Sequence, residues 1–155
     1  MRRFAALVLG TFAFAFALAA QAQLPRTPEA RGPVPQELAS LTSLTCRFHA
    51  GSRTRWAGGE PTTSEAPVDS EIRFEDIDLG RGSVRVLARM RIDEAHVAIS
   101  PVGMFMINVQ PGVIDITTVF PSERGDGVFP AVNVRQSRAG TAVSEQSFGR
   151  CSEKP

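Results

Sequence analysis

The amino-acid sequence predicts an all-β domain, an antiparallel meander of seven to eight strands that forms a closed or nearly closed barrel. Three observations lead to this prediction. Segments after Leu44 alternate apolar and polar residues, turn residues recur every eight to twelve positions, and no segment beyond the first 43 residues has a helical period. The cysteines, Cys46 and Cys151, lie in the first and last segments, so pairing them would bring the ends together. A two-sheet β-sandwich, whose termini can also meet, is the alternative.

The N-terminal segment has the order of charge and hydropathy that is typical of a secretory signal peptide. Two arginines precede an apolar stretch from Phe4 to Ala20, and Ala20-Gln21-Ala22 supplies a small-residue cleavage site. An uncleaved anchor helix is the alternative, but the stretch is shorter than the roughly 20 residues that a span needs. We therefore expect a signal peptide at residues 1–22, a periplasmic or secreted protein, and no membrane span after cleavage.

The composition of the mature chain excludes one class of partner. The chain has 17 Lys and Arg residues, and losing two arginines leaves 15 against 16 Asp and Glu. A chain this close to neutrality lacks the basic excess of nucleic-acid-binding domains, so no nucleic acid is expected to bind. The remaining length fits one domain, which we expect to be a monomer.

The mature chain divides into a leader, one β domain and a short tail. Residues 23–43 hold four prolines and few large apolar groups, which predicts a mobile leader. Within it, PQELASL at residues 35–41 can form one or two helical turns, because proline is tolerated at a first helical position. The β domain is expected to cover residues 44–151, followed by a C-terminal tail at residues 152–155.

The strand pattern varies in strength along the domain. Residues 83–92 (SVRVLARMRI) give the strongest signal, with Val84, Val86, Ala88, Met90 and Ile92 on one face. Residues 51–70 are rich in Gly, Pro, Ser and Thr, which predicts a long loop with a poor edge strand near Trp56. The other expected strands are LTCRFHA, EIRFEDI, AHVAIS, MFMINVQ, VIDITTVF, VFPAVNVRQS and TAVSEQSFGRC.

The two cysteines are interpreted as a structural disulfide. Export would place Cys46 and Cys151 in an oxidising compartment, and two cysteines allow a single intramolecular pairing. Two separate thiols, or a bridge between chains, are the alternatives. The pairing requires the first and last strands to be neighbours, which favours the barrel.

No catalytic constellation, cofactor site or metal site is indicated. His49 and His96 lack further ligands at metal-binding spacing, and Asp93 and Glu94 beside His96 are interpreted as residues of a surface turn. The acids near residues 75–78 could perform acid–base chemistry but adjoin a predicted turn, where solvated acids are common. We therefore expect no enzyme and no cofactor.

A group of arginines on one predicted strand has two interpretations. Arg85, Arg89 and Arg91 share a face, which would suit an anion or carboxylate site. Alternatively, they pair across strands with Glu71 and Glu75 on the solvent side, and this second interpretation is favoured.

The segment MFMINV is apolar on both faces. One face would fill the core, and the other would meet a second sheet, the loop around Trp56, a partner or a ligand. Methionine suits adaptable apolar surfaces. We therefore consider Trp56, Met104 and Met106 a candidate surface for an apolar ligand or a partner.

Three short motifs carry a resemblance. Cys-x-Phe begins at Cys46, TTVF occupies residues 117–120, and Gly-x-Cys ends at Cys151. In this order the sequence resembles a group of exported bacterial β-rich proteins without assigned activity, over about residues 44–151. The resemblance implies an extracytoplasmic β-rich domain. The chain differs from lipocalins, whose first strand carries Gly-x-Trp, because here the glycines follow the tryptophan in RTRWAGG; only the architecture is analogous.

Two functions from different classes follow from these patterns. The first is an exported small barrel that binds a small apolar ligand, as suggested by the predicted closure and by MFMINV. The alternative is an envelope protein–protein interaction or structural module, in which residues 51–70 or the apolar strand meet an envelope protein.

Overall fold

The computed structural model describes residues 32–88 and 91–153. The predicted signal peptide and residues 23–31 of the predicted leader lie outside the described residues. The elements in chain order are α1 Gln36–Ala39, β1 Leu44–Ala57, β2 Glu60–Asp78, β3 Ser83–Ala88, β4 Arg91–Ser100, β5 Gly103–Gln110, β6 Val113–Val119, β7 Val128–Ala139 and β8 Thr141–Ser152.

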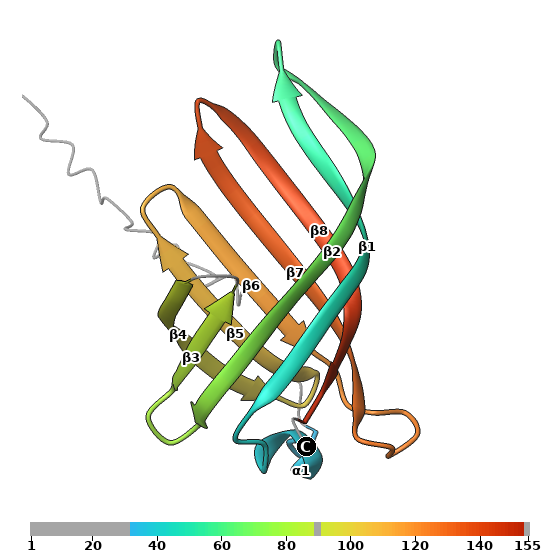
Figure 1. The fold of residues 1–155 in the computed structure, drawn as a ribbon, viewed down its shortest axis with the longest axis vertical. Helices are drawn as coiled ribbons and strands as arrows, with labels where there is room; N and C mark the ends of the chain where they lie inside the picture. Colours follow the sequence, from blue (N-terminus) through green and yellow to red (C-terminus); the bar gives the residue numbers. More distant parts are fainter. Residues whose placement is uncertain (1–31, 89–90, 154–155) are drawn as a thin grey trace, which may run out of the picture.

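The eight strands form one antiparallel sheet that closes on itself. Each strand pairs with its neighbour in the chain, and β1 also pairs with β8, so the sheet forms a closed barrel (Figure 1). The prediction of an all-β meander is confirmed, and the structure is a barrel rather than the alternative sandwich. Closure leaves the first and last strands paired on both sides, which removes two sheet edges that could pair with other chains.

The hydrophobic core fills the end of the barrel that α1 covers. Leu38 of α1 and Leu41 after it are buried in this core, and burying each leucine stabilises the fold by roughly 1.5–3 kcal/mol. The other members are Leu44, Cys46, Phe48, Phe74, Ile77, Val84, Val86, Ala95, Val97, Met104, Met106, Val119, Phe129, Ala131 and Cys151.

The segment before β1 is part of this packed end. The predicted helical turns of PQELASL are confirmed at Gln36–Ala39. The Ser122 backbone N–H donates a hydrogen bond of 2.8 Å to the Glu37 carboxylate, which ties α1 to the segment between β6 and β7. In the described part of the chain, no helix is both long and apolar enough to cross a membrane.

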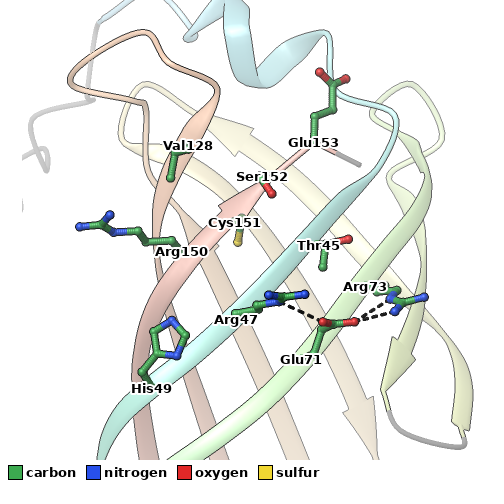
Figure 2. A pocket seen from close by; sticks show the side chains of 10 residues that line it. All are labelled: Thr45, Arg47, His49, Glu71, Arg73, Val128, Arg150, Cys151, Ser152 and Glu153. Atoms are coloured by element: carbon green, nitrogen blue, oxygen red, sulfur yellow. Dashed lines mark hydrogen bonds and ion pairs between the residues drawn. The ribbon is translucent and has the colours of Figure 1, made fainter. Parts of the chain in front are cut away.

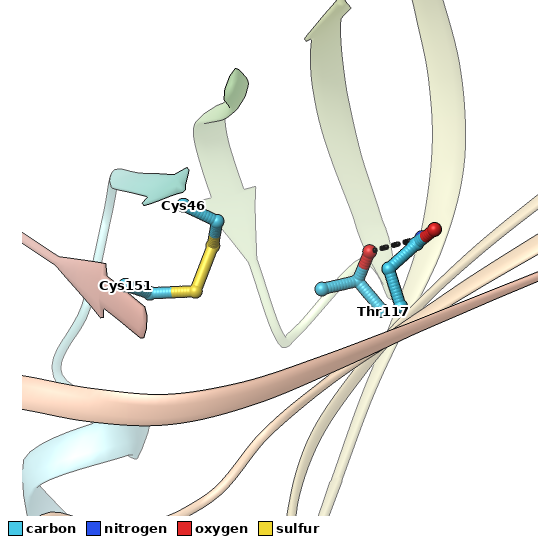
Figure 3. The surroundings of a disulfide bond; sticks show 4 residues. Cys46, Thr117 and Cys151 are labelled. Carbon is cyan, nitrogen blue, oxygen red and sulfur yellow. Dashed lines mark hydrogen bonds between the residues drawn. A yellow bond between two sulfur atoms is a disulfide. The ribbon is translucent and has the colours of Figure 1, made fainter. Parts of the chain in front are cut away.

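A disulfide joins the two strands that close the barrel. Cys46 of β1 and Cys151 of β8 are direct partners in the register, and their side chains point into the core (Figure 3). The predicted pairing of the first and last strands is confirmed.

Gly149, two positions before Cys151, allows a close approach of β8 to β1. The register of β1 shifts between Phe48 and Ala50, on both of its sides. Gly149 lies opposite Phe48 in β8, and a side chain at Gly149 would overlap the backbone of Arg47 and Phe48. Only a glycine allows β8 to approach β1 this closely. The irregularity changes which residues of β1 point inward. Before it, even-numbered residues such as Cys46 and Phe48 point into the core, and after it the odd-numbered residue Arg53 lines the cavity.

The prediction of a long loop at residues 51–70 is wrong. β1 and β2 continue through this segment as one hairpin that turns at Gly58 and Gly59. Both glycines have positive φ angles, of 64° and 91°, which supply the tight turn that long strands need. Cross-strand contacts such as the 2.8 Å hydrogen bond between the Thr54 and Thr63 hydroxyl groups replace the missing apolar alternation.

The prediction of one strand over residues 83–92 is also wrong. β3 ends at Ala88, β4 begins at Arg91, and these two residues pair. Alternation could not reveal the reversal, because apolar residues recur at even positions across it. Ile92 consequently lies on the outer face with 69% of its surface exposed, whereas Arg91 lines the interior.

Removal of the disulfide is expected to destabilise the barrel strongly. The bond closes a loop of 105 residues, for which the chain-entropy value is about 4.7 kcal/mol. Replacing both Cys46 and Cys151 by Ser should therefore lower the thermal midpoint by many degrees. The melting of this variant should not respond to reductant, whereas the wild-type midpoint should fall on reduction. Equal wild-type midpoints in reducing and oxidising buffer would contradict the prediction.

Candidate functional site

The interior of the barrel is divided into an apolar half and a polar half. The apolar half is the core next to α1. The other half is an open cavity of about 720 Å³, within the range of small-molecule sites. Figure 1 shows the β1–β2 and β7–β8 hairpins extending away from α1 on this side. Phe74, Val86 and Met106 lie at the boundary and form an apolar floor.

Charged and amide side chains surround the cavity one level above this floor. They occupy a single row of the register, in which Arg53 pairs with Glu145, Glu145 with Arg135, Arg135 with Asp115, and Asp115 with Asn108. Opposite charges therefore alternate on neighbouring strands, an arrangement that stabilises sheets. Asp93 of β4 joins this row through its hydrogen bond with the Asn108 side chain. These residues, Arg53, Asp93, Asn108, Asp115, Arg135 and Glu145, are called the interior ring.

The contacts within the interior ring differ in quality. Arg53 Nε donates to Glu145 Oε1 at 2.5 Å. Asp93 accepts hydrogen bonds from the side-chain amides of Gln110 at 2.8 Å and Asn108 at 3.4 Å, and Arg91 Nη2 lies 3.6 Å from its Oδ1. Within the ring, Arg53, Glu145 and Asp93 therefore have hydrogen-bond partners in the protein.

The pair Asp115–Arg135 is the open part of the ring. Arg135 Nη1 lies 3.9 Å from Asp115 Oδ2, which is too long for a hydrogen bond. Burial raises the pKa of Asp115 above its ordinary value; Arg135 opposes this rise, and the carboxylates of Glu145 and Asp93 add to it. Asp115 and Arg135 thus retain donor and acceptor capacity that a ligand in the cavity can use.

A second polar level separates the ring from the core. The Asn133 side-chain amide donates a hydrogen bond of 3.0 Å to Thr117 Oγ1. Thr117 is buried, and Ser147 pairs with Asn133 in the register. The interior therefore changes from apolar to hydroxyl and amide groups, and then to charged groups, along the barrel axis.

The three residues predicted as an apolar surface do not form one site. Met104 and Met106 are buried inside the barrel, and Met106 lines the cavity floor. Trp56 lies near the end of β1, opposite Pro61, with 43% of its surface exposed. The structure therefore brings the methionines together in the core and places the tryptophan on the projecting hairpin.

The second apolar face of MFMINV points outward. It continues across β5, β6, β7 and β8, where the register places outward residues side by side. Val109 and Phe148 expose 64% and 47% of their surfaces. We call this surface the outer apolar face; its residues are Phe105, Ile107, Val109, Ile114, Ile116, Val132, Val134 and Phe148.

The predicted arginine face is resolved into separate roles. Arg85 forms ion pairs with Glu75 at 2.8 Å and Asp76 at 3.1 Å, as the cross-strand interpretation predicts. Arg91 instead points into the cavity, and Arg89 lies outside the described residues.

The predicted surface turn around His96 is part of β4. Asp93 lies inside the barrel, whereas Glu94 and His96 are exposed on its outer side. His49 lines a depression on the outer face of β1. Within residues 32–88 and 91–153, no group of three or more His, Cys, Asp or Glu residues could hold a metal ion.

The strand patterns discussed above do not predict the interior ring, although the sequence contains a signal for it. In β5 the inward residues change from Met104 and Met106 to Asn108 and Gln110. In β6 the inward residues change from Val119 through Thr117 to Asp115, and β7 shows the same order. An apolar-to-polar change on the same face of several strands indicates a barrel that is packed at one end and open at the other.

Comparison of the chain with protein-family models, curated proteins and solved structures gives no match.

Substitutions of two ring carboxylates are expected to act in opposite directions. Because the folded-state pKa of Asp115 lies above its unfolded value, its ionised form destabilises the fold above that pKa. The penalty is relieved as the pH falls through the folded-state pKa. Asp115→Asn should therefore raise the thermal midpoint at neutral pH, and the gain should vanish in acid.

Asp93→Asn is the matched control. It removes the negative charge that accepts hydrogen bonds from Gln110 and Asn108 and faces Arg91, and leaves a neutral amide oxygen in its place, which should cost about 1–2 kcal/mol of stability at neutral pH. Thermal melts of both variants across the acidic range check the pair. A lower midpoint for Asp115→Asn at neutral pH would contradict this account of the ring.

Proposed function

We propose that the barrel is an exported binding protein that holds one small amphipathic molecule in its open half. The observation that supports this proposal is the cavity of about 720 Å³ with an apolar floor and a charged ring above it. A disulfide persists in an oxidising compartment, which agrees with the periplasmic or secreted location that the N-terminal segment predicts.

The lining favours an amphipathic ligand over the wholly apolar one expected from the sequence. Covering Asp115 and Arg135 with hydrocarbon would remove water without replacing its hydrogen bonds, and buried polar groups without partners destabilise a complex. A ligand with an apolar part on Met106 and Phe74 and a polar end at Arg135 avoids that cost. An anionic end would contact the Arg135 guanidinium, whose ion pair with Asp115 is long, at 3.9 Å.

Two probes of the same chain length test this proposal. A fluorescent medium-chain fatty acid and the fatty alcohol of the same length differ only in the charged end. We expect the wild-type protein to bind the acid more tightly, and Arg135→Gln to weaken binding of the acid by about tenfold because one charge-assisted hydrogen bond is lost. Arg85→Gln, on the outer side of β3, is the matched control and should bind like wild type.

Native mass spectrometry of protein purified from the periplasm of the source cell completes the test. An adduct of small-molecule mass that is lost in Arg135→Gln supports the proposal. A filled interior, with no adduct and no affinity for either probe, would reject it.

A second candidate function is interaction with an envelope protein through the outer apolar face. The eight residues of this face, each with about 4.8 Å by 6.7 Å of sheet surface, cover roughly 260 Å². This area is about a third of the roughly 800 Å² per partner in stable complexes. The face therefore fits a transient contact with an apolar strip of another protein better than an obligate dimer.

Photo-cross-linking in the source cell tests the second candidate. A cross-linker at Val109 should capture a discrete envelope protein, and Phe148→Glu on the same face should abolish that product without changing the thermal midpoint. A cross-linker at Arg73, on the charged side of the barrel, is the control. Finding only monomer at Val109, or a product that Phe148→Glu does not affect, would count against it.

A further inference from the structure

The outer face of the barrel carries a cluster of arginines behind the disulfide. Arg47 of β1, Arg73 of β2 and Arg150 of β8 line a depression of about 470 Å³, together with Thr45 and Ser152 (Figure 2). The interior ring lies on the other side of the sheet, and Glu71 is the one residue that lines both this depression and the cavity of the proposed function.

The charges in this depression are only partly compensated. Glu71 is shared between two arginines: its Oε2 lies 3.1 Å from Arg47 Nε, and its Oε1 lies 2.7 Å from Arg73 Nη2. The hydrogen bonds from Arg73 and then Arg47 hold the pKa of Glu71 below its ordinary value, so the carboxylate is ionised at neutral pH. Glu153 also lines the depression. Three guanidinium groups thus face two carboxylates, one of them at the end of the described chain.

The register places two like charges directly opposite each other. Arg47 pairs with Glu71 on one side and with Arg150 on the other. In Figure 2 the Arg150 side chain points away from Arg47. Like charges directly opposite each other destabilise a sheet. By contrast, Arg85 on the outer side of β3 lies opposite Glu75, so opposite charges face each other there.

We propose that this depression binds a phosphate monoester group, which would draw the Arg150 side chain toward Arg47, with Arg73 beside them. A guanidinium group presents paired N–H donors that match the oxygens of a tetrahedral oxyanion. Thr45 and Ser152 pair with each other across β1 and β8 and place two hydroxyl groups at the same depression. A doubly charged anion offsets the repulsion between Arg47 and Arg150, so binding of the anion should also stabilise the folded barrel.

Thermal melting of the mature protein in inorganic phosphate is the first test, with chloride at equal ionic strength as the control. Phosphate should raise the wild-type midpoint by about 5 °C at ten times its dissociation constant, since a ligand of the folded state stabilises it. Arg150→Gln should raise the midpoint without phosphate, because it removes the like-charge pair, and should weaken phosphate binding at least tenfold. Arg85→Gln should keep the wild-type response to phosphate.

Vesicles distinguish the source of the phosphate group. Binding to phosphatidylcholine vesicles only when they contain phosphatidic acid, and loss of that binding in Arg150→Gln, would support a lipid headgroup. A response to inorganic phosphate without vesicle binding would support a soluble phosphate ester. A chloride effect equal to that of phosphate, or an unchanged phosphate response in Arg150→Gln, would overturn the proposal.

Discussion

The pairing of β1 with β8 is the constraint on which the rest of the structure depends. This one register sets Cys46 opposite Cys151, Arg47 opposite Arg150, and Arg53 opposite Glu145. The same strand pair therefore contains the disulfide, two of the three arginines of the outer depression, and the shortest contact of the interior ring. A shift of one residue would move every side chain to the other face. The disulfide and the close approach allowed by Gly149 make that shift costly.

The interior places the packed core and the proposed binding cavity at opposite ends of the barrel. The end covered by α1 contains the buried apolar residues and the disulfide. The other end replaces apolar packing by paired charges and encloses the cavity of about 720 Å³. Polar groups inside a small barrel are costly unless they are satisfied. The incompletely satisfied pair, Asp115 and Arg135, is consequently the place where ligand binding would return the most free energy.

Some parts of the fold follow directly from the sequence, and others depend on contacts that no local pattern encodes. The meander, the closure and the disulfide followed from turn spacing and from the positions of two cysteines. The hairpin through residues 51–70 does not follow from a local pattern, because its strands are held by pairing with each other and, on the β1 side, with β8 rather than by apolar alternation. The interior ring was missed for a related reason: Arg53, Asp115 and Glu145 meet only because register and closure align strands that are far apart in the chain.

Amide hydrogen exchange along residues 51–55 of β1 tests closure of the open half most directly. These residues pair with β2 on one side and with β8 on the other. If the barrel is closed there, every amide in this segment is hydrogen-bonded, and all five should be protected to a similar degree. If closure is confined to the disulfide, β1 is an edge strand beyond it. Alternate amides would then exchange at unprotected rates, which would contradict both the closed barrel and the interior ring.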